Sequence, residues 1–131
     1  SAIEKGIGKI IAVVKLGGVL DEQNKDFGSK VAMHIAASNP LAIDKNGIDT
    51  ATVDKELEIF KAEIKNSGKP AEMAEKISKG KIEKFLNDNS LLNQLWIMDP
   101  KKKVSEILKE NSTKGEIKIL DFVRYKVGEG V

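Results

Sequence analysis

Few residues in this sequence could carry bond chemistry. The chain has one histidine, His34, and no cysteine. The lack of cysteine excludes disulfides, thiolate nucleophiles and sulfur-ligated metals, and His34 has no second imidazole with which to hold a metal. We therefore predict a hydrogen-bonded structural role for His34. Because no set of nucleophile, base and metal can be assembled, we expect a protein that is not an enzyme and needs no cofactor.

Three other motifs resemble ligand sites only in part. The Gly6–Lys9 segment (GIGK) lacks the preceding strand, the spacing and the hydroxyl residue of a phosphate loop. The Asp44–Asp49 segment lacks the alternating ligands and the terminal glutamate of a calcium loop. Lys101–Lys103 could touch phosphate, but a charge run in a chain of balanced charge is usually solvated. We predict turns and solvated surface at these places.

A stronger candidate is the run of large apolar residues Trp96, Ile97 and Met98, which directly precedes Asp99 and Pro100. Such residues can simply belong to a core. Tryptophan, isoleucine and methionine are equally suited to anchor a protein contact. The residue types alone leave both readings open.

The overall composition favours a protein partner. The chain has 131 residues, of which 40% are hydrophobic, and its 22 basic and 20 acidic residues leave a net charge of only +2. Arg124 is the single arginine, and the six aromatic residues are scattered, so neither base readout nor stacking on nucleic acid is indicated. No apolar run reaches the length of a membrane span, and the opening residues do not read as a secretion signal. We expect a cytoplasmic protein with no direct nucleic-acid or membrane contact.

The two ends of the sequence predict a small mixed core. Residues Lys9–Leu16 predict a central strand, and Ser1–Glu4 predict a partner strand before it. An apolar stripe predicts a helix over Phe27–Ser38, ended by Asn39 and Pro40. Residues Ile117–Val127 predict a half-buried strand interrupted by Asp121. Before the last strand, Asp99 is predicted to cap a short helix around Val104, with Pro100 in the first turn of that helix.

The middle of the chain predicts a pair of antiparallel helices. The first, capped by Thr50 or Thr52 and ended by Asn66–Gly68, has a narrow apolar seam typical of a coiled coil at Val53, Leu57, Phe60 and Ile64. A return helix follows from Pro70, with a second seam at Met73, Ile77, Ile82 and Phe85. Gly80 within it indicates either that the two helices approach closely there or that the helix bends locally.

The predicted fold class is therefore α+β, with a small antiparallel sheet packed with helices and an inserted antiparallel coiled-coil hairpin. Residues 1–40 and 93–131 are predicted to form the core, and residues 41–92 the hairpin.

Several segments of this sequence resemble the elongation factor Ts family, and they follow one another in the family's order over nearly the whole chain. They are Val31–Pro40 (VAMHIAASNP), Gly68–Pro70, Ala74–Ile77, Gly80–Ile82, Lys84–Phe85 and Phe122–Gly130 (FVRYKVGEG). The resemblance is to the second core subdomain with its inserted coiled coil. It implies guanine-nucleotide exchange on elongation factor Tu in protein synthesis, with release catalysed by differential binding and not by bond chemistry.

The resemblance also implies site residues. Ile97 and Met98 match positions that the family presents to domain 3 of elongation factor Tu, which favours the contact reading of this run. Leu95 and Trp96 replace the family's proline and phenylalanine, and Lys5 replaces a histidine of the first hairpin. The partner-binding residues implied are thus Lys5, Trp96, Ile97 and Met98.

Two expectations follow for function. The family's threonine-aspartate-phenylalanine segment and its N-terminal module are not found in this sequence, so the chain is expected to bind elongation factor Tu without exchanging its nucleotide efficiently. The alternative is a structural module that acts through self-association as a homodimer.

Overall fold

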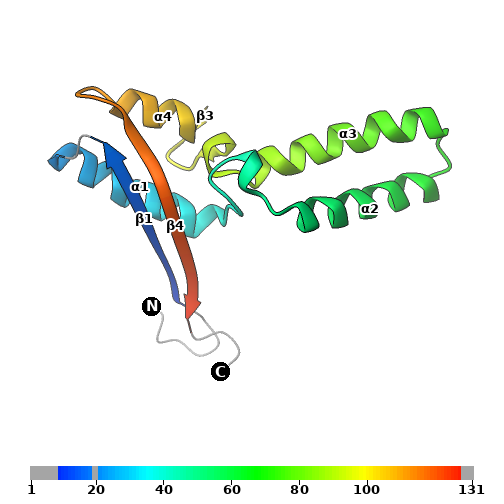
Figure 1. The fold of residues 1–131 in the computed structure, drawn as a ribbon, viewed down its shortest axis with the longest axis horizontal. Coiled ribbons are helices and arrows are strands. Elements are labelled where there is room, and N and C mark those ends of the chain that lie inside the picture. Colours follow the sequence, from blue (N-terminus) through cyan, green and yellow to red (C-terminus); the bar gives the residue numbers. More distant parts are fainter. Residues whose placement is uncertain (1–8, 19–20, 128–131) are drawn as a thin grey trace. The chain divides into compact units, whose positions relative to one another are not determined.

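A computed structural model of the chain describes residues 9–18 and 21–127. The predicted strand at Ser1–Glu4 lies outside the described residues. The elements in chain order are β1 (Lys9–Gly18), α1 (Glu22–Ser38), the short 3-10 turn η1 (Lys45–Gly47), α2 (Thr50–Asn66), α3 (Ala71–Asp88), η2 (Leu91–Asn93), β2 (Leu95–Trp96), β3 (Asp99–Lys103), α4 (Val104–Asn111) and β4 (Ile117–Val127). Four α-helices and two small antiparallel sheets in this part of the chain confirm the α+β class (Figure 1).

The chain divides into two compact units. One contains the residues up to Asn39 together with those from Leu95 onward, and the other contains Pro40–Gln94. The first unit is thus built from two segments that are far apart in the sequence, and the second from one continuous segment.

The sheet of the first unit pairs β1 with β4 in antiparallel fashion, from Lys9 opposite Val127 to Gly18 opposite Ile117. The predicted interruption of the last strand at Asp121 is instead a β-bulge. Lys15 pairs with Asp121 and Leu16 with Ile119, so Leu120 is an extra residue in β4. Both predicted strands are confirmed. Strand β1 ends at Gly18, beyond the predicted end at Leu16.

Helix α1 packs beside β1, and its ends are set by specific contacts (Figure 1). It begins before the predicted Phe27, because the Asp21 carboxylate accepts a hydrogen bond from the Asn24 amide at 3.0 Å and caps the first turn. At the other end Asn39 takes a left-handed conformation with φ of 47°. The guanidinium of Arg124 donates two hydrogen bonds, each 3.2 Å long, to the carbonyl of Ala36 in the last turn.

The core of the first unit joins α1, β2, α4 and β4. Its buried apolar residues are Phe27, Val31, Ile35, Trp96, Val104, Ile117 and Ile119. They come from both ends of the sequence, so this core forms only when the two segments meet.

The second unit is dominated by α2 and α3, which run side by side in opposite directions (Figure 1). Helix α2 spans Thr50–Asn66 as predicted, but its cap is Asp49, whose carboxylate accepts a hydrogen bond from the Ala51 amide at 3.4 Å. Of the predicted seam, Ile64 is buried and the other three residues are half-buried.

The seam of α3 differs from the predicted one near the turn between the helices. Met73 is 52% exposed, while Ser78 is buried and Ala74 half-buried. The Ser78 hydroxyl donates a hydrogen bond to the Glu75 carbonyl at 3.0 Å, so its burial leaves that group satisfied. The small residues Ala74 and Ser78 therefore face the neighbouring helix in this region, where the sequence pattern had predicted Met73.

The prediction that Gly80 marks a close approach of two helices is wrong. A Cβ atom built at Gly80 would meet nothing within 4 Å apart from its own helix backbone and chain neighbours. We therefore expect Gly80→Ala to raise the free energy of unfolding by about 0.5–1 kcal/mol, because alanine restricts the unfolded chain and favours helix. Thermal and urea unfolding followed by circular dichroism measure this change.

Gly68→Ala is the matched control for that measurement. Gly68 also has open space around it, but its φ is 75°, a conformation that an alanine adopts only with strain. Gly68→Ala should lower the free energy of unfolding by about 1 kcal/mol, whereas Gly80→Ala should raise it. A loss of stability in Gly80→Ala would mean that the helix requires glycine at this position.

Candidate protein-binding site

The run Trp96–Met98 forms the end of a small β-hairpin. Trp96 of β2 pairs with Asp99 of β3, which makes Ile97 and Met98 the two residues of the turn. Two-residue hairpin turns usually use asparagine and glycine at positive φ. In the described part of the chain Asn39 is the only residue other than glycine with positive φ, so this turn has a different conformation. Two large apolar residues at a tight turn are unusual.

Burial separates the three residues of the run. Trp96 is only 4% exposed, whereas Ile97 is 38% and Met98 is 44% exposed. Trp96 therefore belongs to the core, whereas Ile97 and Met98 lie at the surface. Trp96 could act on a partner only through the position that it gives to the turn.

An aromatic stack holds the turn in place. The ring of Trp96 lies parallel to the imidazole of His34, with centroids 5.3 Å apart, and is tilted against Phe27 at 6.2 Å. His34 is fully buried, and its Nδ1 accepts a hydrogen bond from the Ile97 amide at 3.3 Å. Nδ1 thus carries no proton in this arrangement. The structural role predicted for His34 is confirmed, and α1 fixes the turn end of the hairpin.

Sequence reasoning missed the link between His34 and the turn. The two hydrogen-bonded residues are 63 positions apart. No local spacing connects them, so no pattern in one segment could have revealed the contact.

The predicted helix cap at Asp99 is wrong. Asp99 and Pro100 begin β3, and α4 starts only at Val104. The Asp99 carboxylate accepts a hydrogen bond from the Lys101 amide at 3.3 Å, and the Lys103 amide at the helix start donates to Glu106 at 3.4 Å. Asp99 pairs with Trp96 in the hairpin, and this tertiary contact overrides the local preference of an Asp-Pro pair for a helix start.

Of the three segments that resemble ligand sites only in part, the structure describes Asp44–Asp49 and Lys101–Lys103, while Gly6–Gly8 lie outside the described residues. The Asp44 carboxylate accepts a hydrogen bond from the Gly47 amide at 3.0 Å, as a turn requires. Lys102 pairs with Glu110, whose hydrogen bond and negative charge raise the pKa of that lysine. Within residues 9–18 and 21–127, no three histidine, cysteine or acidic side chains gather to hold a metal. Lys5 lies outside the described residues.

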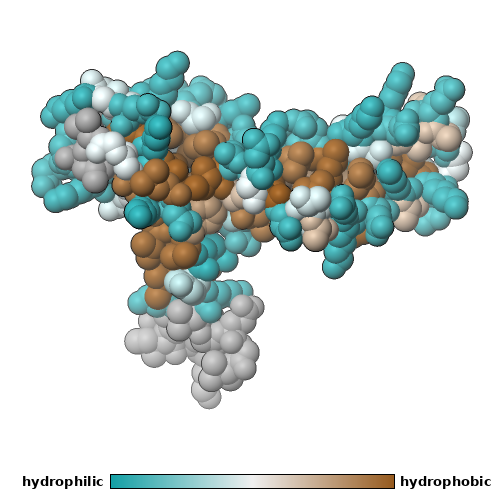
Figure 2. Space-filling view, in the orientation of Figure 1, coloured by the Kyte–Doolittle hydropathy of each residue, from teal (hydrophilic) through white to brown (hydrophobic). Residues whose placement is uncertain are grey.

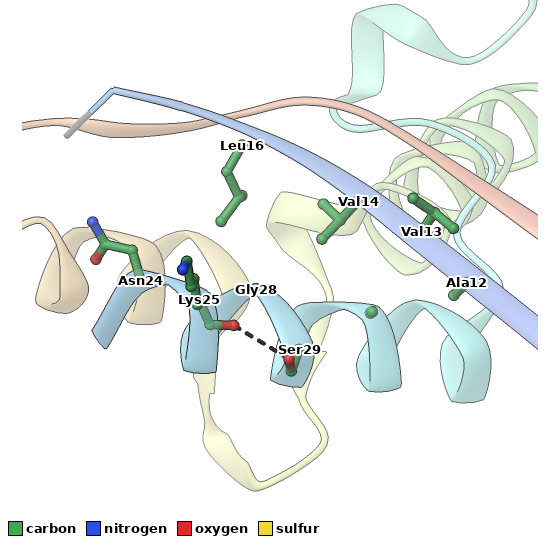
Figure 3. Close-up of a pocket in the computed structure, with 9 residues that line it drawn as sticks. Ala12, Val13, Val14, Leu16, Asn24, Lys25, Gly28 and Ser29 are labelled. Carbon is green, nitrogen blue, oxygen red and sulfur yellow. Dashed lines mark hydrogen bonds between the residues drawn. The ribbon is translucent and has the colours of Figure 1, made fainter. Parts of the chain in front are cut away.

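A groove of about 400 Å³ runs between β1 and α1 (Figure 3). Val14 and Leu16 point from the strand toward the helix, where Gly28 allows close packing because a Cβ there would lie 3.2 Å from Leu16. The hydroxyl of Ser29 donates a hydrogen bond to the Lys25 carbonyl at 3.2 Å. The groove is mostly apolar and presents no acid, base and nucleophile together.

None of the helices in the described ranges is both long and apolar enough to cross a membrane.

Known proteins of one family are similar to this chain over nearly its whole length. The family model described as elongation factor TS matches residues 4–129. Elongation factor Ts from Clostridium kluyveri is 42% identical over 129 residues, covering 96% of this chain and 42% of the relative. The protein of the same name from Nitratiruptor sp. is 44% identical over 109 residues, covering 82% and 36%. That from Nitrobacter hamburgensis is 40% identical over 135 residues, covering 100% and 44%.

The chain thus spans about two fifths of the length of these curated relatives. The family match nevertheless covers both segments of the first unit and the whole of the second. The chain belongs to the elongation factor Ts family.

Proposed function

We propose that this chain takes part in translation elongation as the part of a guanine-nucleotide exchange factor that binds elongation factor Tu. The proposed contact surface is the Ile97–Met98 turn, directed at domain 3 of the partner. The observation that carries the proposal is an exposed apolar pair at a tight turn, fixed from below by the buried Trp96 and His34. A preorganised anchor of this kind loses little conformational freedom on binding.

The proposed mechanism involves no bond chemistry. An exchange factor accelerates nucleotide release when it binds the nucleotide-free state of its partner more tightly than the GDP-bound state. In this mechanism the chain contributes binding to elongation factor Tu. It acts in the cytoplasm, where translation takes place. Trp96 supports the contact from the core, and Lys5, which lies outside the described residues, remains a predicted contact.

Replacing both Ile97 and Met98 with alanine should weaken binding to nucleotide-free elongation factor Tu by about 10- to 100-fold, as expected for central anchors of an interface. Both side chains are exposed, so the melting temperature should stay close to that of the parent. Isothermal titration calorimetry and thermal circular dichroism measure the two effects.

Met33→Ala is the control, because Met33 is 58% exposed on α1 of the same unit but lies outside the turn. It should change the affinity by less than about threefold. Equal affinities of the double variant and the parent would remove the turn from the interface. A large fall in the melting temperature of the double variant would show that both side chains belong to the core.

GDP release separates binding from exchange. Elongation factor Tu loaded with a fluorescent GDP analogue is mixed with this polypeptide or with the full-length relative from Clostridium kluyveri. Since the polypeptide spans 42% of that relative, we expect binding with slower GDP release. Release as fast as with the full-length relative would place the whole exchange activity in these 131 residues.

A second candidate function is self-association as a structural module, and one observation favours it. The paired residues Ile11 with Tyr125 and Val13 with Val123 lie on one face of the β1–β4 sheet, and all four are at least 40% exposed. Figure 2 shows apolar surface along these strands. Light scattering distinguishes the two functions, because a stable dimer without affinity for elongation factor Tu would favour the second.

A further inference from the structure

A pocket of about 410 Å³ lies beside the proposed contact turn, inside the first unit. Its apolar walls are Phe27, Trp96, Met98 and Ile107. Phe27 and Trp96 are 3% and 4% exposed, so two walls belong to the packed core and keep their positions. Met98 belongs to both the turn and the pocket, which makes the pocket continuous with the surface that we propose for elongation factor Tu.

The polar groups of this pocket are mostly hydrogen-bond acceptors. Asp26, Asp99 and Asn111 line it, and Lys30 is the one cation among its lining residues. Lys30 forms an ion pair with Asp26 at 3.1 Å, so these two charges offset each other. The amide nitrogen of Asn111 already donates to the Ile107 carbonyl at 2.8 Å, which leaves its side-chain oxygen as an acceptor.

Asp99 is the acidic residue of the pocket for which the described ranges hold no direct ion pair. One of its carboxylate oxygens accepts the hydrogen bond from the Lys101 amide. No lysine or arginine of the described ranges lies within ion-pair distance of it. Lys102 is attracted to Asp99 at longer range, but its ammonium group is hydrogen-bonded to Glu110, which is the larger cause of its raised pKa. If a partner covered this carboxylate without pairing its charge, the cost of desolvating the carboxylate would lower the affinity between the two proteins.

We propose that this pocket receives an arginine side chain of the protein partner, with its guanidinium directed at Asp99. The inference rests on the proposed function and adds the chemistry that the partner must present. The aliphatic stem of an arginine suits the Met98 and Ile107 walls, and the N–H donors of its planar head suit the Asp99 carboxylate and the Asn111 side-chain oxygen. A purely apolar or an acidic side chain would leave Asp99 buried without a counter-charge.

The test uses two variants with opposite expected effects. Asp99→Asn keeps the oxygen that accepts the Lys101 amide, so the fold is preserved while the charge is lost. It should weaken binding to nucleotide-free elongation factor Tu by about tenfold, as for the loss of a charge-assisted hydrogen bond. Lys30→Gln removes the competing cation and should tighten binding by about two- to threefold, more at low salt than at high salt. Asp121→Asn, which makes the same charge change on β4 outside the pocket, should have little effect.

Calorimetric titrations of Clostridium kluyveri elongation factor Tu at two salt concentrations give the outcomes. Weaker binding of Asp99→Asn with tighter binding of Lys30→Gln supports the inference. The opposite pair of signs would mean an anionic occupant and would overturn it. If neither variant changes the affinity while alanine at Ile97 and Met98 does, the pocket stays empty in the complex, and only the arginine inference fails. No binding by the parent chain would overturn the proposed function as well.

Discussion

Replacing Gly18 with alanine should lower the free energy of unfolding by about 3 kcal/mol or more, through backbone strain and overpacking. Gly18 ends β1 with φ of 104°, a conformation that residues with a side chain rarely adopt. An added Cβ would lie only 2.0 Å from the Glu116 carbonyl oxygen and 3.2 Å from the Ile117 Cα. These obstructing atoms are backbone, and Ile117 is the residue paired with Gly18 at the start of β4. The strand pair must therefore separate locally to admit the methyl group.

The neighbouring Gly17 provides the matched control. A Cβ there would lie 2.8 Å from the Leu120 side chain, which is 50% exposed and can rotate away. Gly17→Ala should therefore cost only about 1 kcal/mol. Thermal melting by circular dichroism compares the two variants, and hydrogen exchange of the β4 backbone amides reports on the strand pair. Equal losses in the two variants would show that the β1–β4 pairing can rearrange around Gly18.

Trp96→Ala should lower the free energy of unfolding by about 3–5 kcal/mol, the usual range for removal of a buried aromatic side chain. The indole ring fills the space between His34 and Phe27, and both are themselves buried. Its loss leaves a cavity under the turn and removes the stacked surface that positions His34. The turn residues should then lose their fixed position, so binding to elongation factor Tu should fall together with stability.

Trp96→Phe is the conservative comparison, because a phenyl ring keeps an aromatic contact with His34 and should lose less than half as much stability. Urea unfolding followed by circular dichroism measures both variants. In the parent chain, Trp96 is the only tryptophan, so its fluorescence reports on this core during unfolding. If Trp96→Ala melted like the parent yet bound its partner weakly, the indole ring would have to be a direct contact. That result would contradict its observed burial.

Residue patterns predicted the type of most elements. The β-branched residues after Lys9 predicted β1, and the repeat from Val53 to Ile64 predicted α2, because both patterns follow the geometry of a single element. The ends of elements were harder to predict. Helix α1 starts at the Asp21 cap, which the apolar stripe alone does not show. The bulge at Leu120 depends on pairing with a strand from the other end of the chain.

The candidate site was predictable as a segment and not as an arrangement. The run Trp96–Met98 stood out by residue type, and the resemblance to elongation factor Ts singled out Ile97 and Met98. Neither source indicated that His34 binds the Ile97 amide, or that Asp26 and Asp99 line one pocket. These relations join α1 to the hairpin formed by β2 and β3, and they arise only when the two segments of the first unit pack together.

The order of residues alone was enough to indicate the family, the α+β class and the helical pair. It could not say which residue of the run Trp96–Met98 faces inward, because three neighbouring apolar side chains have similar preferences for burial. Packing made that choice. The pairing of Trp96 with Asp99 and its stacking on His34 turn the indole into the core, and the tight turn that results leaves Ile97 and Met98 exposed.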